Sequence, residues 1–277
     1  MAKFNWYEHL CDYHNVTPEK VIELGTRSSG RKPDLPGSKT CKKVSGMTYE
    51  DIWALKDRRT DKEIFDFYRD QGAWSTFRQC VRHSDMVGQH IQYFNMLNKA
   101  GLMREGFHFC EYGSGVAPFS STLLNCIDTN SKIEITICDV DSDHFDFAKY
   151  RLNRIKKDHN FNNVKLNFLE IKPDKLPKFN SAIDATFCFE VLEHVPSPLS
   201  VIKNITNSIP PGGVYVENFI KHNDLDDDDD GPDLPSARKE RDLYYSYLNE
   251  YYNLIHPNYK ENEGNPNVTR IWQRNSL

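Results

Sequence analysis

The sequence has no apolar run that approaches the ~20 residues needed to cross a bilayer, so we expect no membrane partner. Residues 1–10 contain no apolar segment typical of a secretory signal, and we therefore expect a cytoplasmic protein. Basic charge is scarce, because 35 Lys and Arg residues stand against 40 Asp and Glu residues, for a net charge of −5. This balance argues against a nucleic-acid partner.

Cysteine pairs of the CxxC type are absent. The seven cysteines are scattered, and Cys110, Cys138 and Cys188 each fall inside a predicted strand. This distribution favours buried, reduced thiols over a disulfide framework, and we predict no metal site.

The pattern of hydrophobic residues divides the chain at about residue 105. Residues 1–104 are predicted to form a mainly helical extension or lid, with its longest helices at 60–71 and 75–100. From residue 105 the pattern alternates between short β-type runs and helical segments. The predicted strands are 107–111, 131–138, 164–170, 182–190 and 214–219, and the helices between them are 118–127, 142–159 and 197–208. Such alternation predicts an α/β fold, a mostly parallel sheet with helices on both faces.

The last part of the chain departs from this alternation. Residues 221–260 contain an acidic run, Asp226 to Asp230, and a tyrosine-rich helix at 237–252, and we interpret them as an insertion at the acceptor site. Residues 252–274 predict a C-terminal antiparallel hairpin, which brings the expected sheet to seven strands.

One turn carries most of the functional signal. A predicted strand ends at Glu111, and Gly113 and Gly115 follow before Pro118 starts a helix. Glycines at these positions let a ligand approach bare backbone. The next three strands also end in acids, at Asp139, Glu170 and Glu190. Because parallel sheets bind ligands at the carboxyl ends of their strands, these acids are predicted to surround one site, with Asp139 placed to accept hydrogen bonds from a ribose.

A nicotinamide dinucleotide is a poor match to this turn. Pro118 occupies the third glycine position of a GxGxxG pattern, and Glu111 lies where a pyrophosphate would need positive potential. An acidic site of this kind favours a cationic nucleoside without phosphates.

Four segments resemble, in order, the motifs of class I S-adenosylmethionine-dependent methyltransferases. They are Glu111 to Ala117, Ile137 to Asp141, Asp184 to Val195 and Ile209 to Val216, and together they cover about 105–220. Ala117 stands where the family usually has a third glycine. The resemblance implies a Rossmann-like fold, S-adenosylmethionine as the cofactor and a methyltransferase activity.

The resemblance also implies roles for individual residues around the cofactor. Gly113 and Gly115 would lie under its methionine part, with Glu111 near the ammonium group. Asp139 would hold the ribose hydroxyls, and Val140 or Asp141 would flank the adenine. The remaining contacts would be Glu170, or its neighbour Ile171, at the adenine edge, and Glu190 and Val191 beneath the reactive methyl group.

The acceptor site is less well defined by sequence. We predict that Tyr68, Trp74, Arg78 and His222 contact a small-molecule acceptor. His194 and His83 are the candidate catalytic bases, although His90, His222 and His256 are also available and spacing does not separate them. Three other functions stay open: a binding or scaffold protein that has lost catalysis, a nicotinamide-dependent oxidoreductase, and a nucleic-acid methyltransferase. The last lacks an Asn-Pro-Pro-Tyr-like segment, and the sequence leaves the oligomeric state open.

Overall fold

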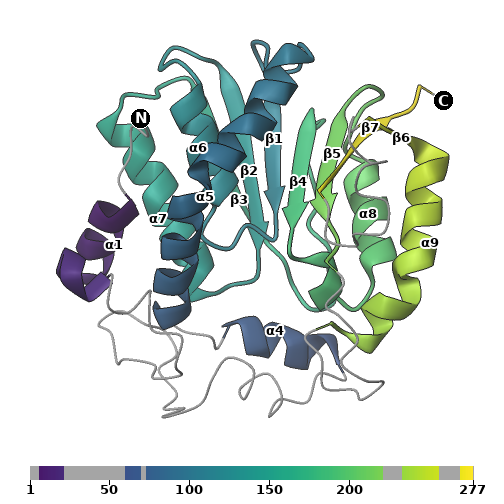
Figure 1. The fold of residues 1–277 in the computed structure, drawn as a ribbon, viewed down its shortest axis with the longest axis horizontal. Helices are drawn as coiled ribbons and strands as arrows, with labels where there is room; N and C mark the ends of the chain where they lie inside the picture. Colours follow the sequence, from purple (N-terminus) through teal and green to yellow (C-terminus); the bar gives the residue numbers. More distant parts are fainter. Residues whose placement is uncertain (1–5, 22–59, 70–72, 221–232, 256–268, 277) are drawn as a thin grey trace.

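The computed structural model describes residues 6–21, 60–69, 73–220, 233–255 and 269–276. Within these residues the chain forms one sheet with helices on both faces (Figure 1). Its strands are β1 (His108–Tyr112), β2 (Ile133–Asp139), β3 (Val164–Glu170), β4 (Ala185–Phe189), β5 (Val214–Asn218), β6 (Tyr252–Leu254) and β7 (Arg270–Arg274). The helices are α1 (Trp6–His14), α4 (Asp61–Arg69), α5 (Ala73–Lys99), α6 (Pro118–Cys126), α7 (Asp143–Asp158), α8 (Pro198–Thr206) and α9 (Pro235–Tyr251).

The seven strands lie in the order β3-β2-β1-β4-β5-β7-β6. Strands β1 to β5 pair in parallel, whereas β7 runs antiparallel to β5 and β6 antiparallel to β7. This confirms the predicted Rossmann-like sheet with its C-terminal antiparallel hairpin. The chain leaves β1 in one direction toward β3 and then crosses to β4 on the other side. The point between β1 and β4 is therefore the switch point, where such sheets bind ligands.

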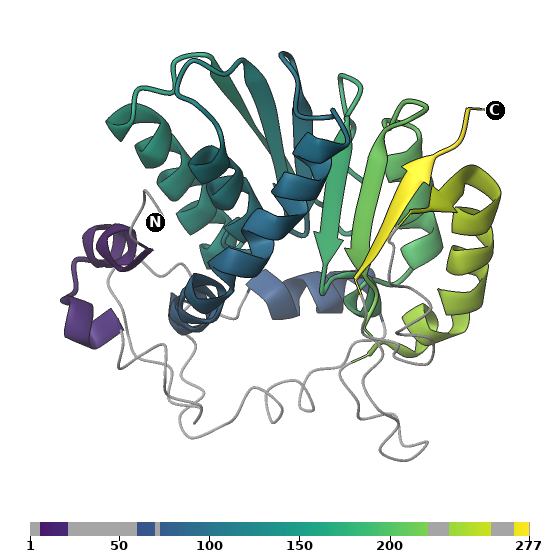
Figure 2. The same ribbon diagram turned by 45° about the horizontal axis from the view of Figure 1, so that its top comes forward.

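Alternate residues of each strand enter two separate cores. Phe109, Ile135 and Phe187 pack with α5, α6 and α7 on one face of the sheet. Cys110 and Tyr215 pack with α8 and α9 on the other face. Burial on both faces explains why the central strand β4 is almost continuously apolar. Figure 2 shows α5 lying across the first of these faces.

The tyrosine-rich helix α9 belongs to the second face. Tyr244 is fully buried, and its hydroxyl donates to the hydroxyl of Tyr215 at 3.0 Å. The aromatic spacing of this helix thus serves packing against α8 and β5. The acidic run Asp226 to Asp230 lies outside the described residues.

Helices α1 and α4 attach the N-terminal part of the chain to the sheet. Arg151 of α7 is buried, lies 3.0 Å from the ring centroid of Trp6 in α1, and donates to Ser121 Oγ at 2.7 Å. Helix α4 lies beside the carboxyl ends of the strands in both views (Figure 1), where Ile64 packs into the second core. The domain division at residue 104 stays a prediction. None of the helices in the described ranges is long and apolar enough to cross a membrane.

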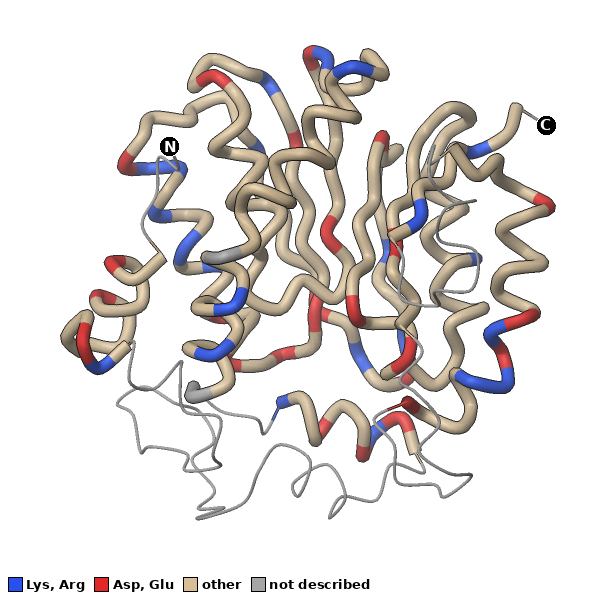
Figure 3. The backbone as a smooth tube through the Cα atoms, viewed as in Figure 1, with Lys and Arg blue, Asp and Glu red and all other residues tan. Residues whose placement is uncertain are grey.

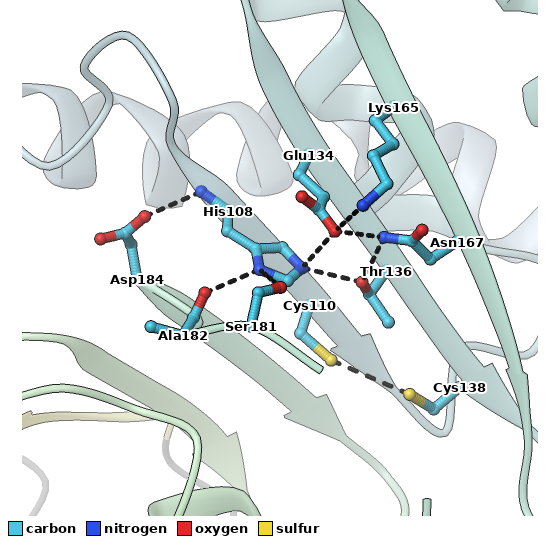
Figure 4. A network of polar contacts seen from close by, with 10 residues as sticks. All are labelled: His108, Cys110, Glu134, Thr136, Cys138, Lys165, Asn167, Ser181, Ala182 and Asp184. Carbon is cyan, nitrogen blue, oxygen red and sulfur yellow. Dashed lines mark hydrogen bonds and ion pairs between the residues drawn. The ribbon is translucent and has the colours of Figure 1, made fainter. Parts of the chain in front are cut away.

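A buried polar network ties together the start of the sheet, away from the switch point (Figure 4). His108 is only 6% exposed, and its Nδ1 and Nε2 lie 2.8 Å from Ala182 O and Thr136 Oγ1, respectively. The backbone N–H of His108 donates to Asp184 Oδ2 at 2.8 Å. Both ring nitrogens therefore join β1 to its neighbours on either side.

We expect His108→Phe to lower the free energy of unfolding by about 1–2 kcal/mol, because it leaves Thr136 Oγ1 and Ala182 O with fewer partners in a buried place. Urea unfolding of the two proteins measures this difference. Lys165→Met is the matched control, since it removes only the exposed Lys165–Glu134 pair of the same network, at 2.9 Å, and is expected to change stability by less than about 0.5 kcal/mol. An equal effect of both substitutions would contradict this role of His108.

Candidate functional site

The glycine turn after β1 folds back onto the end of β2. The N–H groups of Gly113 and Ser114 both donate to Cys138 O, at 2.8 and 3.0 Å. Gly113 has φ +66°, and a Cβ atom there would lie 2.2 Å from Cγ2 of Val191. Gly115 has φ +50° and open space where its Cβ would be. Gly113 thus allows contact with Val191, while Gly115 leaves backbone exposed to a ligand.

Asp139 ends β2 directly beneath this turn. Its carboxylate accepts the N–H of Val140 at 2.7 Å and the N–H of Gly115 through its other oxygen. A carboxylate has about four acceptor positions, so each oxygen keeps one for a ligand hydroxyl. This geometry fits the predicted contact with the two hydroxyls of a ribose. Burial raises the pKa of Asp139 to about 6.

Glu111 is 4% exposed, and its carboxylate is bound to the start of α6. It accepts the N–H groups of Phe119 at 3.1 Å and of Ser120 at 2.7 Å, and the Ser120 hydroxyl at 2.6 Å. Burial raises the pKa of Glu111 to about 7. Because these N–H groups are occupied, this helix end does not offer them to a pyrophosphate, which counts against a nicotinamide dinucleotide.

A cavity of about 820 Å³ opens at this edge of the sheet. Most of the residues predicted for the site line it. They are Tyr68, Arg78, His83, Glu111, Gly113, Gly115, Asp139, Val140, Glu190, Val191 and His194. The volume lies toward the upper end of the range for ligand pockets, ~300–1,000 Å³, and leaves room for more than one ligand.

Of the predicted residues that the structure describes, Asp141 and Glu170 do not line the cavity. Both side chains are exposed, whereas Ile171, the alternative to Glu170 at the adenine edge, lines the cavity. The side chain of Trp74 and the whole of His222 lie outside the described residues. The adenine contacts of Asp141 and Glu170 therefore stay predictions without support from the cavity.

Acidic residues gather along the carboxyl ends of the strands, above α4 in Figure 3. Glu190 of this group is bound by Arg82 of α5 in a bidentate ion pair, with Arg82 Nη1 2.6 Å from Glu190 Oε2. Glu190 has φ +54°, and its N–H donates to Asn218 Oδ1 at 2.7 Å. The pair links α5 to the end of β4 across the switch point and neutralises both charges.

His194 lies in a short 3₁₀ helix after β4, Leu192–His194, which the sequence did not predict. Its Nε2 is 3.8 Å from Oε1 of Glu193, which is fully buried. Burial raises the pKa of Glu193 well above its usual range. The role of His194 as a base stays a prediction.

Sequence reasoning missed the part of the cavity wall that α5 provides beyond His83. Met86, Gln89 and Tyr93 all line the cavity, together with Phe119 and Phe189. The available signal was that Met86, Gln89 and Tyr93 follow His83 in successive steps of three, three and four residues, which places them on one face of the helix. That spacing alone does not distinguish a cavity wall from a packed core.

Residues 110–215 match the family model described as "Methyltransferase domain". Among solved structures, the chain is similar to the [4+2]-cyclase SpnF (15% identity, 60% of this chain, 57% of that chain, TM-score 0.43). It is also similar to an S-adenosylmethionine-dependent methyltransferase from Aquifex aeolicus (18% identity, 58% of this chain, 80% of that chain, TM-score 0.41). A third similar structure is the CurJ carbon methyltransferase (16% identity, 78% of this chain, 58% of that chain, TM-score 0.47). The chain thus spans under two thirds of the length of SpnF and CurJ. A comparison with curated proteins finds no match.

The matched range runs from β1 to β5 and contains the glycine turn, Asp139 and Glu190. The fold, the turn and the family match agree on one class. Residues 110–215 therefore carry a methyltransferase domain with the class I fold, whose cofactor is S-adenosylmethionine.

Proposed function

We propose that the protein transfers the methyl group of S-adenosylmethionine to a small-molecule acceptor bound in the cavity. The observation that carries this proposal is the cavity itself. It begins at the glycine turn and Asp139 and continues along α5 from Ser75 to Tyr93, ~27 Å at 1.5 Å per residue. A site of this length has room for an acceptor beside the cofactor.

The residues that line the cavity would have two roles: some would hold the cofactor, and others would enclose the reacting groups. S-adenosylmethionine, when bound, supplies an electrophilic methyl group on a sulfonium. Asp139 would hold its ribose through the two acceptor positions left free, and Gly115 would let its chain lie against backbone. Glu190 and Val191 would form the floor at the reacting end. Proximity, alignment and exclusion of water can together supply ~7–11 kcal/mol of barrier lowering for such a transfer.

The net negative charge of the protein and the acids around the cavity favour a small-molecule acceptor over a nucleic acid. The net charge is −5, and the strand ends around the cavity carry acids. The bidentate contact of Arg82 with Glu190 removes one of the cations that a phosphate backbone would use. Polynucleotide binding depends on several such uncompensated cations.

Calorimetry with S-adenosylhomocysteine and S-adenosylmethionine tests the cofactor half of the proposal. We expect both to bind to the purified protein, and absence of binding would refute the function. Retention of a labelled RNA or DNA oligonucleotide at physiological salt tests the acceptor half. Tight retention would replace the small-molecule acceptor with a nucleic acid.

A further inference from the structure

One part of the cavity has an aromatic wall. We call it the aromatic arm, and it is formed by Met86, His90, Tyr93, Phe119, Phe187 and Phe189. The ring centroids of Phe119 and Phe189 are 4.5 Å apart, and those of Tyr93 and Phe189 are 5.5 Å apart. Tyr93 is held in place by the 2.9 Å hydrogen bond between its hydroxyl and Thr269. These walls suit a flat apolar ring.

Two histidines of α5 stand at this arm with hydrogen-bonding capacity that the protein does not use. The rings of His83 and His90 have centroids 5.5 Å apart, and His90 is 1% exposed. Nδ1 of His83 and both ring nitrogens of His90 are buried without a partner among the described residues. Nε2 of His83 is not enclosed in this way, so it is the imidazole atom that a ligand in the cavity can reach.

Both imidazoles are neutral at physiological pH. Burial lowers the pKa of His90 to about 4. Burial, with help from His90, Arg82 and Arg151, lowers the pKa of His83 to about 3. A neutral imidazole donates one hydrogen bond and accepts one, as a hydroxyl group does. Since both rings are neutral, neither supplies the counter-charge that a buried carboxylate or ammonium group would need.

We propose that the aromatic arm binds the ring of an uncharged, hydroxylated aromatic acceptor, and that His83 hydrogen-bonds its hydroxyl group. This inference rests on the proposed function, because it places the acceptor in the same cavity as the methyl donor. The ring lies beside His90 and Phe119, whose ring centroids are 4.3 Å apart, and its hydroxyl is directed toward His83.

Three small probes of similar size test the inference by NMR titration with saturating S-adenosylhomocysteine. p-Cresol has the ring and the hydroxyl, toluene lacks the hydroxyl, and 4-methylcyclohexanol lacks the aromatic ring. We expect p-cresol to bind about 2- to 13-fold more tightly than toluene, as one net hydrogen bond predicts. It should also bind more tightly than 4-methylcyclohexanol.

The variant His83→Phe keeps a ring but removes both nitrogens, so the preference for p-cresol over toluene should disappear while affinity for S-adenosylhomocysteine is retained. His14→Phe is the matched control, because His14 packs against Phe77 outside the cavity lining, and the preference should persist there. His83→Leu replaces His83→Phe if thermal unfolding shows that the latter does not fold.

Two results would overturn the inference: equal affinities for p-cresol and toluene in the unaltered protein, or a preference that survives in the His83 variant. Failure to bind S-adenosylhomocysteine would instead overturn the proposed function. The two failures are therefore distinguishable.

Discussion

Gly113→Ala is expected to lower the free energy of unfolding by about 2–5 kcal/mol and to weaken binding of S-adenosylhomocysteine. Two physical terms add at this position. Its φ of +66° is a left-handed conformation that costs an alanine roughly 1–2 kcal/mol. The new Cβ would also lie 2.2 Å from Cγ2 of Val191, and overpacking of this kind costs about 1–3 kcal/mol. Chemical denaturation and calorimetry measure the two effects.

The double variant Gly113→Ala/Val191→Ala separates these terms. Removal of the Val191 side chain relieves the steric contact but not the backbone strain, so we expect it to restore about 1–2 kcal/mol. Gly88→Ala is the control for alanine itself, because Gly88 lies in α5 with nothing within 4 Å of its Cβ position. That substitution should raise stability by about 0.5–1 kcal/mol. No recovery in the double variant would contradict the steric explanation.

Gly113 illustrates which features of the site could be predicted from the sequence and which could not. The pattern Glu-x-Gly-x-Gly after an apolar run predicted a turn at the end of a strand, and that turn is present. The sequence suggested that both glycines make room for a ligand, yet only Gly115 leaves open space. The close neighbour of Gly113 is Val191, which comes from the far side of the switch point. Contacts between distant segments of this kind leave no local pattern.

Other features of the site could not be predicted for the same reason, because they depend on contacts between segments that are distant in the sequence. The alternation of strands and helices predicted the fold well, since it depends on local periodicity. The ion pair between Arg82 and Glu190 joins residues 108 positions apart, so their charges could be noticed but not paired. The left-handed backbone of Glu190, with φ +54°, is set by tertiary contacts rather than by residue type. Glu170 was assigned from its strand end, but exposure there depends on the edge position of β3 in the sheet.

Asp139→Asn is expected to weaken binding of S-adenosylhomocysteine about 10- to 100-fold at pH 7.5, because a neutral amide replaces the charged acceptor of two hydroxyl hydrogen bonds. Asp141→Asn is the matched control: Asp141 is exposed and outside the cavity lining. Its substitution should change the affinity little. An equal loss in both variants would show that the effect is not specific to Asp139 and would contradict its assignment to the ribose.

The pH dependence of binding gives an independent check on Asp139. Its pKa is raised to about 6 by burial, with opposing effects of Lys149 and of the N–H groups of Gly115 and Val140. The ligand hydroxyls need the ionised carboxylate, so affinity should be full above pH 7 and fall by up to about tenfold per pH unit below pH 6. In Asp139→Asn this fall should flatten, leaving only the contribution of Glu111, whose pKa is raised to about 7. Calorimetry between pH 5 and 8 measures both profiles, and an unchanged slope in the variant would assign the titration to Glu111 instead.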